Sequence, residues 1–199
     1  MVALQDLSAW LEADDPEERQ IISGVRWESY DVLLNSRDRL PHRITYLDGV
    51  LELVSPSRRH ERRKSIIGSL LEDYFKEKRI PYFPLGSTTF RQQNQQGGVE
   101  PDESYCLGSE KALPDLAIEV VVTSGGIDKL EVYRRLQVSE VWFFKNDRFE
   151  LYCLTPEGYQ LVESSRLLPH LDIALLSQSV VAPDPLEAAI AFRSAIQKP

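Results

Sequence analysis

A single carboxylate, Glu119, interrupts the most apolar and β-branched stretch of this chain, residues 116–122. An ionised carboxylate in such a run loses its hydration at a cost of several kcal/mol, so a positive group must face it. Lys129 follows as the only charge on a helical stripe with spacing i, i+3, i+4 and i+7. The other members of this stripe are Val132, Tyr133 and Leu136. The pattern predicts a strand and a following helix that each aim one charge inward.

Asp102, which follows a proline in the segment 99–102, adds a second carboxylate. Carboxylate oxygens suit Mg²⁺, and such an ion positions a nucleophilic water and stabilises the charge that develops on a phosphodiester. A lysine beside it orients and helps to deprotonate the water, or neutralises the phosphate. The alternative is a buried Glu119–Lys129 ion pair and an Asp102 that only begins a strand. Because buried ion pairs contribute little to stability, the joint placement favours a site.

The periodicity around these residues predicts one α/β unit. Asp-Gly at 48–49 indicates a hairpin over residues 43–54, in which Glu52 either faces a site or faces solvent. The polar segment 92–98 is predicted to be a loop, and the tail from residue 164 is less regular. Further strands are predicted at 84–91, 102–106, 116–122 and, as a meander, 141–145, 149–154 and 159–162, and helices at 27–34, 57–78, 127–137 and 186–196.

A basic cluster opens the helix predicted at 57–78. It contains Arg58, Arg59, His60, Arg62 and Arg63. Cations near a helix N-terminus oppose the helix dipole, so a docked anion explains their position, while a solvated helix face is the alternative. His60 by itself is typical of an exposed surface histidine, and is otherwise placed to contact a phosphate or to steer Glu52.

Composition sets the outer limits. The 199 residues are 42% hydrophobic and 27% charged, which predicts one globular domain. The net charge of −8 argues against a protein that coats nucleic acid, although a local basic surface is compatible with it.

No apolar stretch approaches the roughly 20 residues that span a bilayer, and the start lacks signal-peptide features, so a cytoplasmic protein is expected. Cys106 and Cys153 are expected to be buried reduced thiols, with no disulfide or zinc site.

The order of several motifs resembles a known family. They are Leu-Asp-Gly-Val-Leu-Glu-Leu-Val-Ser-Pro-Ser at 47–57, His60, Gly-Gly-Val-Glu-Pro-Asp at 97–102, Ile-Glu-Val-Val at 118–121, Asp128-Lys129, Tyr133 and Glu140-Val141-Trp142. In this combination, over residues 27–163, the chain is similar to the Uma-two family of restriction-endonuclease-like proteins.

The resemblance implies a PD-(D/E)XK nuclease core, which is a mixed β-sheet flanked by helices. Here this core is expected to carry a C-terminal β-meander and peripheral N- and C-terminal helices. It also implies Mg²⁺, with Mn²⁺ as a substitute, and DNA as the substrate. We expect a single domain over 1–199, with an N-terminal arm at 1–26, the nuclease-like core at 27–163 and a C-terminal extension at 164–199.

The resemblance also implies roles for individual residues. Asp102 and Glu119 match the two motif acids, and Glu52 looks like an additional one that acts as a third ligand or holds a metal water. Val121 occupies the position at which the motif usually has a lysine. Members of the family typically carry that lysine on the next helix instead, so Lys129 is the matching residue in this chain. The predicted catalytic residues are Glu52, Asp102, Glu119 and Lys129, the predicted metal ligands are Asp102, Glu119 and the backbone of Val120, and the predicted nucleic-acid contacts are the five residues of the basic cluster.

Two hypotheses of different classes follow. The first is a metal-dependent endonuclease that acts on DNA, favoured by the inward-facing acids and lysine. The second is a catalytically weak or inactive nuclease-fold protein that binds nucleic acid or a protein partner, favoured by the acidic net charge and by Val121. A homodimer is expected for the nuclease, because two-fold symmetry pairs two sites and the edge of the meander is available for pairing.

Overall fold

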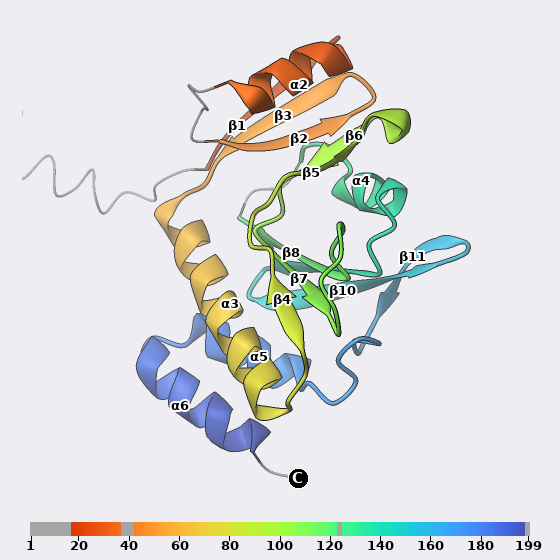
Figure 1. Cartoon of the computed structure of the whole chain (residues 1–199). Helices are drawn as coiled ribbons and strands as arrows, with labels where there is room; N and C mark the ends of the chain where they lie inside the picture. Colours follow the sequence, from red (N-terminus) through yellow and green to blue (C-terminus); the bar gives the residue numbers. More distant parts are fainter. Residues whose placement is uncertain (1–16, 37–41, 123–124, 198–199) are drawn as a thin grey trace, which may run out of the picture.

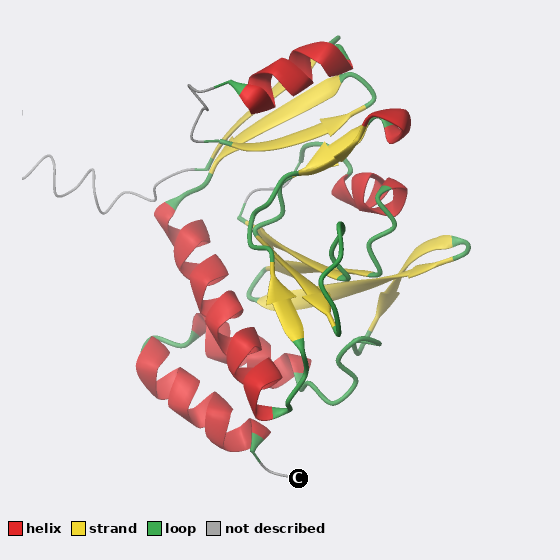
Figure 2. Ribbon diagram, in the orientation of Figure 1, coloured by secondary structure: helices red, strands yellow, loops and turns green. Residues whose placement is uncertain are grey.

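The computed structural model describes residues 17–36, 42–122 and 125–197 (Figure 1). These residues form two β-sheets with helices packed around them (Figure 2). The architecture predicted from the sequence, a mixed sheet flanked by helices, is confirmed, and a second sheet accompanies it. Within the described ranges, no helix combines the length and the apolar composition that crossing a lipid bilayer requires.

The first sheet is antiparallel, with the strand order β1-β3-β2-β6-β5. Helix α2 (Trp27–Asn35) covers one of its faces with Trp27 and Tyr30. Because side chains alternate along a strand, Arg43 and Glu52 point to the opposite face, toward the second sheet. The strands are β1 (Glu18–Ser23), β2 (Arg43–Leu47), β3 (Val50–Ser55), β5 (Phe90–Gln92) and β6 (Gly97–Val99).

The second sheet is mixed, with the strand order β11-β10-β9-β8-β7-β4. Its parallel pair, β8 and β9, is joined through helix α4 (Lys129–Arg135), and its last three strands form the predicted meander. The strands are β4 (Tyr82–Pro84), β7 (Glu103–Leu107), β8 (Leu116–Val121), β9 (Glu140–Lys145), β10 (Arg148–Thr155) and β11 (Gly158–Val162).

Strand β8 separates two parts of the core. Leu116, Ile118 and Val120 face α3 (Arg58–Glu77), α5 (Ile173–Val181) and α6 (Pro185–Ile196), which lie together beside the second sheet (Figure 1). Ala117 packs instead against the apolar stripe of α4. Glu119 shares the face of Ala117 by alternation, so the sequence of β8 aims its carboxylate at α4. The helices at 27–34, 57–78 and 186–196 are confirmed, whereas α5 was not predicted.

Two predictions in the segment between α3 and β7 are wrong. The strand predicted at 84–91 is interrupted, because β4 pairs in the second sheet and β5 in the first, and the chain crosses between them near Gly86 (φ +55°). The loop predicted at 92–98 contains a short 3-10 turn (Gln93–Gln95) and then β6. Gly97 and Gly98 resemble a turn locally, but the lack of a side chain at Gly98 serves packing.

Gly98 lies directly beneath Tyr30, which is fully buried and stacks on Tyr46 with 4.8 Å between ring centroids. A Cβ atom on Gly98 would overlap the Tyr30 hydroxyl oxygen and lie 2.9 Å from two ring carbons. We therefore expect Gly98→Ala to lower the free energy of unfolding by about 1–3 kcal/mol, measured by chemical denaturation. Gly97→Ala is the matched control, because a Cβ there meets only ordinary contacts at 3.6 Å and beyond. Equal losses in the two variants would contradict this packing explanation.

A second buried carboxylate, Glu140, ties the C-terminal segment to β9. It is 1% exposed and accepts hydrogen bonds from the indole of Trp142 (2.9 Å), the Ser165 hydroxyl (2.7 Å) and the backbone N–H groups of Arg166 (2.6 Å) and Leu167 (2.9 Å). The thiol of Cys153 lies 3.3 Å away as a further donor. Cys106 and Cys153 are both buried free thiols, as predicted.

Candidate active site

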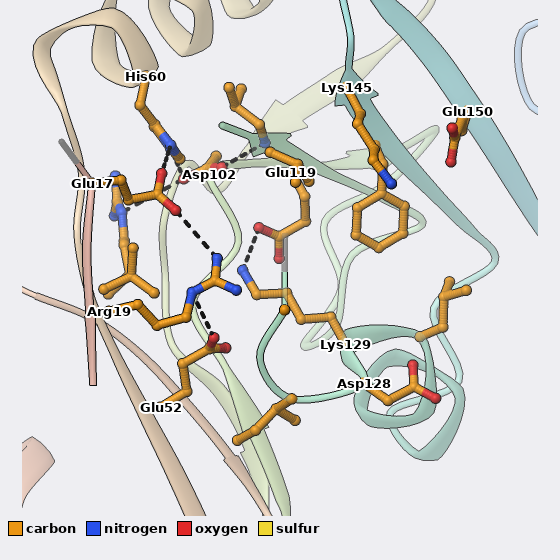
Figure 3. Close-up of a pocket in the computed structure, with 18 of the residues that line it drawn as sticks. Glu17, Arg19, Glu52, His60, Asp102, Glu119, Asp128, Lys129, Lys145 and Glu150 are labelled. Carbon is orange, nitrogen blue, oxygen red and sulfur yellow. Dashed lines mark hydrogen bonds and ion pairs between the residues drawn. The ribbon is translucent and has the colours of Figure 1, made fainter. Parts of the chain in front are cut away.

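The four predicted catalytic residues line one cavity between the two sheets (Figure 3). Its volume is about 290 Å³. Glu52 comes from β3, Asp102 from the turn before β7, Glu119 from β8 and Lys129 from the first turn of α4. Val121, at the usual place of the motif lysine, also lines the cavity. Four segments that are distant in the sequence therefore converge; this was predicted for Asp102, Glu119 and Lys129, whereas Glu52 had been left open between a site and solvent.

Glu119 is held between two donors from α4. The Lys129 ammonium lies 2.7 Å from Oε2, and the Tyr133 hydroxyl donates to Oε1 at 2.6 Å. The glutamate is 2% exposed, and this burial, together with the nearby Asp102, raises its pKa against the opposing effects of Lys129 and Tyr133. Burial alone would lower the pKa of Lys129, but Glu119, Asp102 and Glu52 outweigh it and raise that pKa. The lysine is therefore charged and faces three carboxylates.

Asp102 is fixed by contacts to both of its oxygens. The ring nitrogen Nε2 of His60 lies 2.8 Å from Oδ1, and the backbone N–H of Val120 donates to Oδ2 at 2.7 Å. Arg43 Nε lies 3.7 Å from Oδ1. Burial alone would raise the pKa of Asp102, but the hydrogen bond and the charge of His60, with Lys129 and the Val120 N–H, lower it below its ordinary value. Asp102 is thus the more acidic of the two central carboxyl groups.

His60 is buried rather than exposed, contrary to the expectation for a histidine near a helix start. It is 4% exposed and lies between Asp102 and Glu17, whose Oε2 is 3.1 Å from Nδ1. Burial by itself would lower its pKa, but hydrogen bonds to Asp102 and Glu17 raise it to about 9. Ser57 caps α3 by accepting from the backbone N–H of His60 at 3.1 Å, and the His60 ring lies at the cavity. His60 therefore orients Asp102 from within the cavity.

Two further charged residues, Glu17 and Arg19, come from the segment at 1–26 that was expected to be an arm. Residues 18–23 form β1 and pair with β3, Glu17 directly precedes this strand, and residues 1–16 of the expected arm lie outside the described residues. Arg19 Nη2 lies 3.2 Å from Glu17 Oε1, and Arg19 Nε lies 3.1 Å from Glu52 Oε1. The charges at positions 17 and 19 share one strand face, which is the signal that could have indicated them. Glu52 is 1% exposed and faces this site, not solvent.

The remaining basic residues of the cluster at the start of α3 separate into two groups. Arg58, Arg59 and Arg62 are exposed. Arg63 forms an ion pair with Asp147 and lies 5.5 Å from the centroid of the Phe144 ring. The exposed arginines lie on the same helix end that carries His60 into the cavity, but none of these three lines the cavity itself.

The described residues contain no group of three or more His, Cys, Asp and Glu side chains already gathered to hold a metal ion. Asp102 and Glu119 supply anionic oxygens that retain lone pairs beyond their hydrogen bonds. The Val120 N–H points to Asp102, and the C=O of the same residue leaves the strand on the same side, beyond the last β7 pair at Glu103–Ile118. This donor set of two carboxylates and one carbonyl fits Mg²⁺, which keeps several waters.

Comparison with known proteins agrees with this geometry. Residues 27–183 match the family model Uma2, described as "Putative restriction endonuclease". The chain belongs to the Uma2 family. A search of curated proteins finds no match. The Uma2 match includes Glu52, His60, Asp102, Glu119 and Lys129, whereas Glu17 and Arg19 precede it.

Proposed function

We propose that this Uma2 protein is a metal-dependent endonuclease that hydrolyses phosphodiester bonds in DNA. One observation carries the proposal: Glu119, buried in an apolar strand and 2.7 Å from the Lys129 ammonium, shares a cavity with Asp102. A purely structural ion pair would not require a second buried carboxylate and a cavity in front of it. Membership of a restriction endonuclease family supports the same chemistry.

Asp102, Glu119 and the Val120 carbonyl would hold Mg²⁺, or Mn²⁺ in its place. The bound ion would supply Lewis-acid stabilisation of the phosphate and activation of water at neutral pH. Each acid is oriented before any ion arrives, because His60 and the Val120 N–H hold Asp102 while Tyr133 holds Glu119. This arrangement lowers the reorganisation that metal binding requires.

The cationic side chains of the protein would have two tasks, one at the reacting phosphate and one at the DNA backbone. Lys129 is 22% exposed and lies at the cavity, where its ammonium is placed to orient the attacking water and to neutralise charge on the phosphate. Glu52 faces Lys129 across the cavity and is placed to accept a hydrogen bond from a water there. Arg58, Arg59 and Arg62 are exposed in the first turns of α3, the helix that carries His60, and would contact the DNA backbone beyond the cavity itself.

Metal binding tests the proposal first. We expect the wild type to bind Mn²⁺ in isothermal titration calorimetry, and Glu119→Gln to bind it at least about 10-fold more weakly, because a ligand oxygen is lost. The matched control is Glu157→Gln, an exposed glutamate in the β10–β11 turn that accepts only from Thr155 among the hydrogen bonds of the described residues. If the wild type binds no Mn²⁺, the proposal fails and a nuclease-fold binding protein is the better description.

Cleavage of supercoiled plasmid in Mg²⁺ then tests the reaction. Asp102→Asn and Glu119→Gln should each reduce the rate at least about 100-fold, and Glu157→Gln should leave it unchanged. Cleavage that persists equally in both site variants would identify a contaminating nuclease and would remove the support for an enzyme.

A further inference from the structure

Arg19 reaches the cavity from outside the segment that matches the family. Strand β1 adds to the edge of the first sheet in antiparallel register, with Arg19 opposite Val54 and Ile21 opposite Glu52. Paired residues in an antiparallel ladder share a face, so Arg19 and Glu52 are diagonal neighbours on the cavity face. The opposite face of the sheet packs on α2. The register of β1 therefore fixes a guanidinium beside the proposed metal site.

Only some of the nitrogens of the Arg19 guanidinium contact acceptors in the protein. Its Nη2 lies 3.2 Å from Glu17 and its Nε 3.1 Å from Glu52, which hold the group in place. Its Nη1 is buried and has no hydrogen-bond acceptor in the part of the chain that the structure describes, and the contact of its Nε with Glu52 is an ion pair without hydrogen-bond geometry. In Figure 3 the Arg19 guanidinium and the Lys129 ammonium both point into the cavity, which both residues line. A buried N–H donor without an acceptor is costly, which indicates that a ligand supplies one.

The loop before α4 is shaped around this guanidinium. A Cβ on Gly126 would overlap Glu52 Oε1 and lie 2.8 Å from Arg19 Nη1, while a Cβ on Gly125 would lie 4.0 Å from Nη1. Both glycines have positive φ, +102° for Gly125 and +112° for Gly126, a backbone that side chains rarely adopt. A side chain at Gly126 would fill the space in which Arg19 and Glu52 meet.

We propose that Arg19 is a phosphate-binding residue, whose Nη1 donates to a non-bridging oxygen of the phosphodiester held at Asp102 and Glu119. The proposal rests on the proposed nuclease function for the identity of its ligand. Arg19 from β1 and Lys129 from α4 line one cavity, so an oxyanion between them contacts two cations. A guanidinium suits this task, because it keeps its charge and its planar N–H groups match the spacing of phosphate oxygens. The N-terminal strand thus completes the site.

Inorganic phosphate is the probe, titrated into the full chain in buffer with Mg²⁺ and followed by ³¹P NMR. We expect Arg19→Met to weaken phosphate binding about 5- to 50-fold and Arg19→Lys to be intermediate, since lysine keeps the charge and loses the fork. Mn²⁺ affinity, measured separately by calorimetry, should change less than about twofold. Arg26→Met, an exposed arginine just after β1 with no side-chain capping bond, is the matched control and should behave as the wild type.

Each outcome decides the proposal. Unchanged phosphate binding in Arg19→Met, or no phosphate binding by the wild type, overturns it even if plasmid is cleaved. A loss of Mn²⁺ affinity in Arg19→Met as large as its loss of phosphate affinity also overturns the proposal, because Arg19 would then act only by holding Glu52. Phosphate binding that depends on Arg19 without plasmid cleavage supports this site and rejects the nuclease. If Arg19→Met fails to fold, Arg19→Lys decides by the same two affinities.

Discussion

Lys129→Met is expected to reduce DNA cleavage at least about 100-fold while divalent metal binding is retained or becomes tighter. The ammonium that neutralises Glu119 at 2.7 Å would be gone, and with it the cation proposed to act on the water and the phosphate. Glu119 and Asp102 would then lack one of their counter-charges, so the two carboxylates would attract a divalent cation more strongly. Loss of activity without loss of metal distinguishes a catalytic lysine from a structural one.

Plasmid cleavage in the presence of Mg²⁺ measures the loss of activity, and calorimetry with Mn²⁺ measures the retained metal binding. Thermal unfolding provides a third measurement. Without metal, Lys129→Met should unfold at a lower temperature than the wild type, because a buried carboxylate loses its partner. Added Mg²⁺ should raise its unfolding temperature more than that of the wild type. Lys111→Met is the matched control, since Lys111 forms a 2.6 Å ion pair with Asp115 at the surface. Cleavage within about threefold of the wild type in Lys129→Met would reject the assigned role.

Glu140→Ala is expected to lower the free energy of unfolding by about 3–5 kcal/mol. The substitution would leave the indole N–H of Trp142 and the backbone N–H groups of Arg166 and Leu167 without their acceptor inside the protein. Each such donor costs roughly 1–3 kcal/mol when it is buried and unpaired. The segment after β11 would lose its attachment to β9.

Urea denaturation of the metal-free protein measures this loss. The matched control is Glu150→Ala on the adjacent strand β10, where the carboxylate accepts a hydrogen bond from Tyr152 at 3.4 Å. We expect that control to cost less than about 1 kcal/mol. A loss of similar size in both variants would show that the buried network around Glu140 does not stabilise the fold.

Local sequence patterns predicted the parts of the site that neighbouring residues specify. Glu119 was identified because a charge in an apolar strand requires a partner, and Lys129 because it is the charge on an apolar helical stripe. The hairpin that carries Glu52 was indicated by Asp48-Gly49, whose residues both adopt positive φ. These signals depend on periods of two and 3.6 residues and on turn geometry, which a chain expresses over short distances.

Contacts between distant segments could not be predicted from local sequence patterns. His60 is buried because Asp102 and Glu17, 42 and 43 residues away in the sequence, supply acceptors to both of its ring nitrogens. Strand β6 contains two glycines that resemble a loop, and Tyr30 occupies the space that a side chain on Gly98 would take. Such features depend on the shape and charge of partners that no short window contains.

By itself, the amino-acid sequence determined that the chain builds a mixed α/β core with two acids and a lysine aimed inward, because apolar periodicity decides which side chains are buried. Only the tertiary structure decided which groups accompany them. The register of β1 delivers Arg19, with Glu17 just before the strand, and the first turn of α3 carries His60. The physical reason is that a buried charge demands compensation, whereas the identity of the compensating residue depends on how distant elements pack.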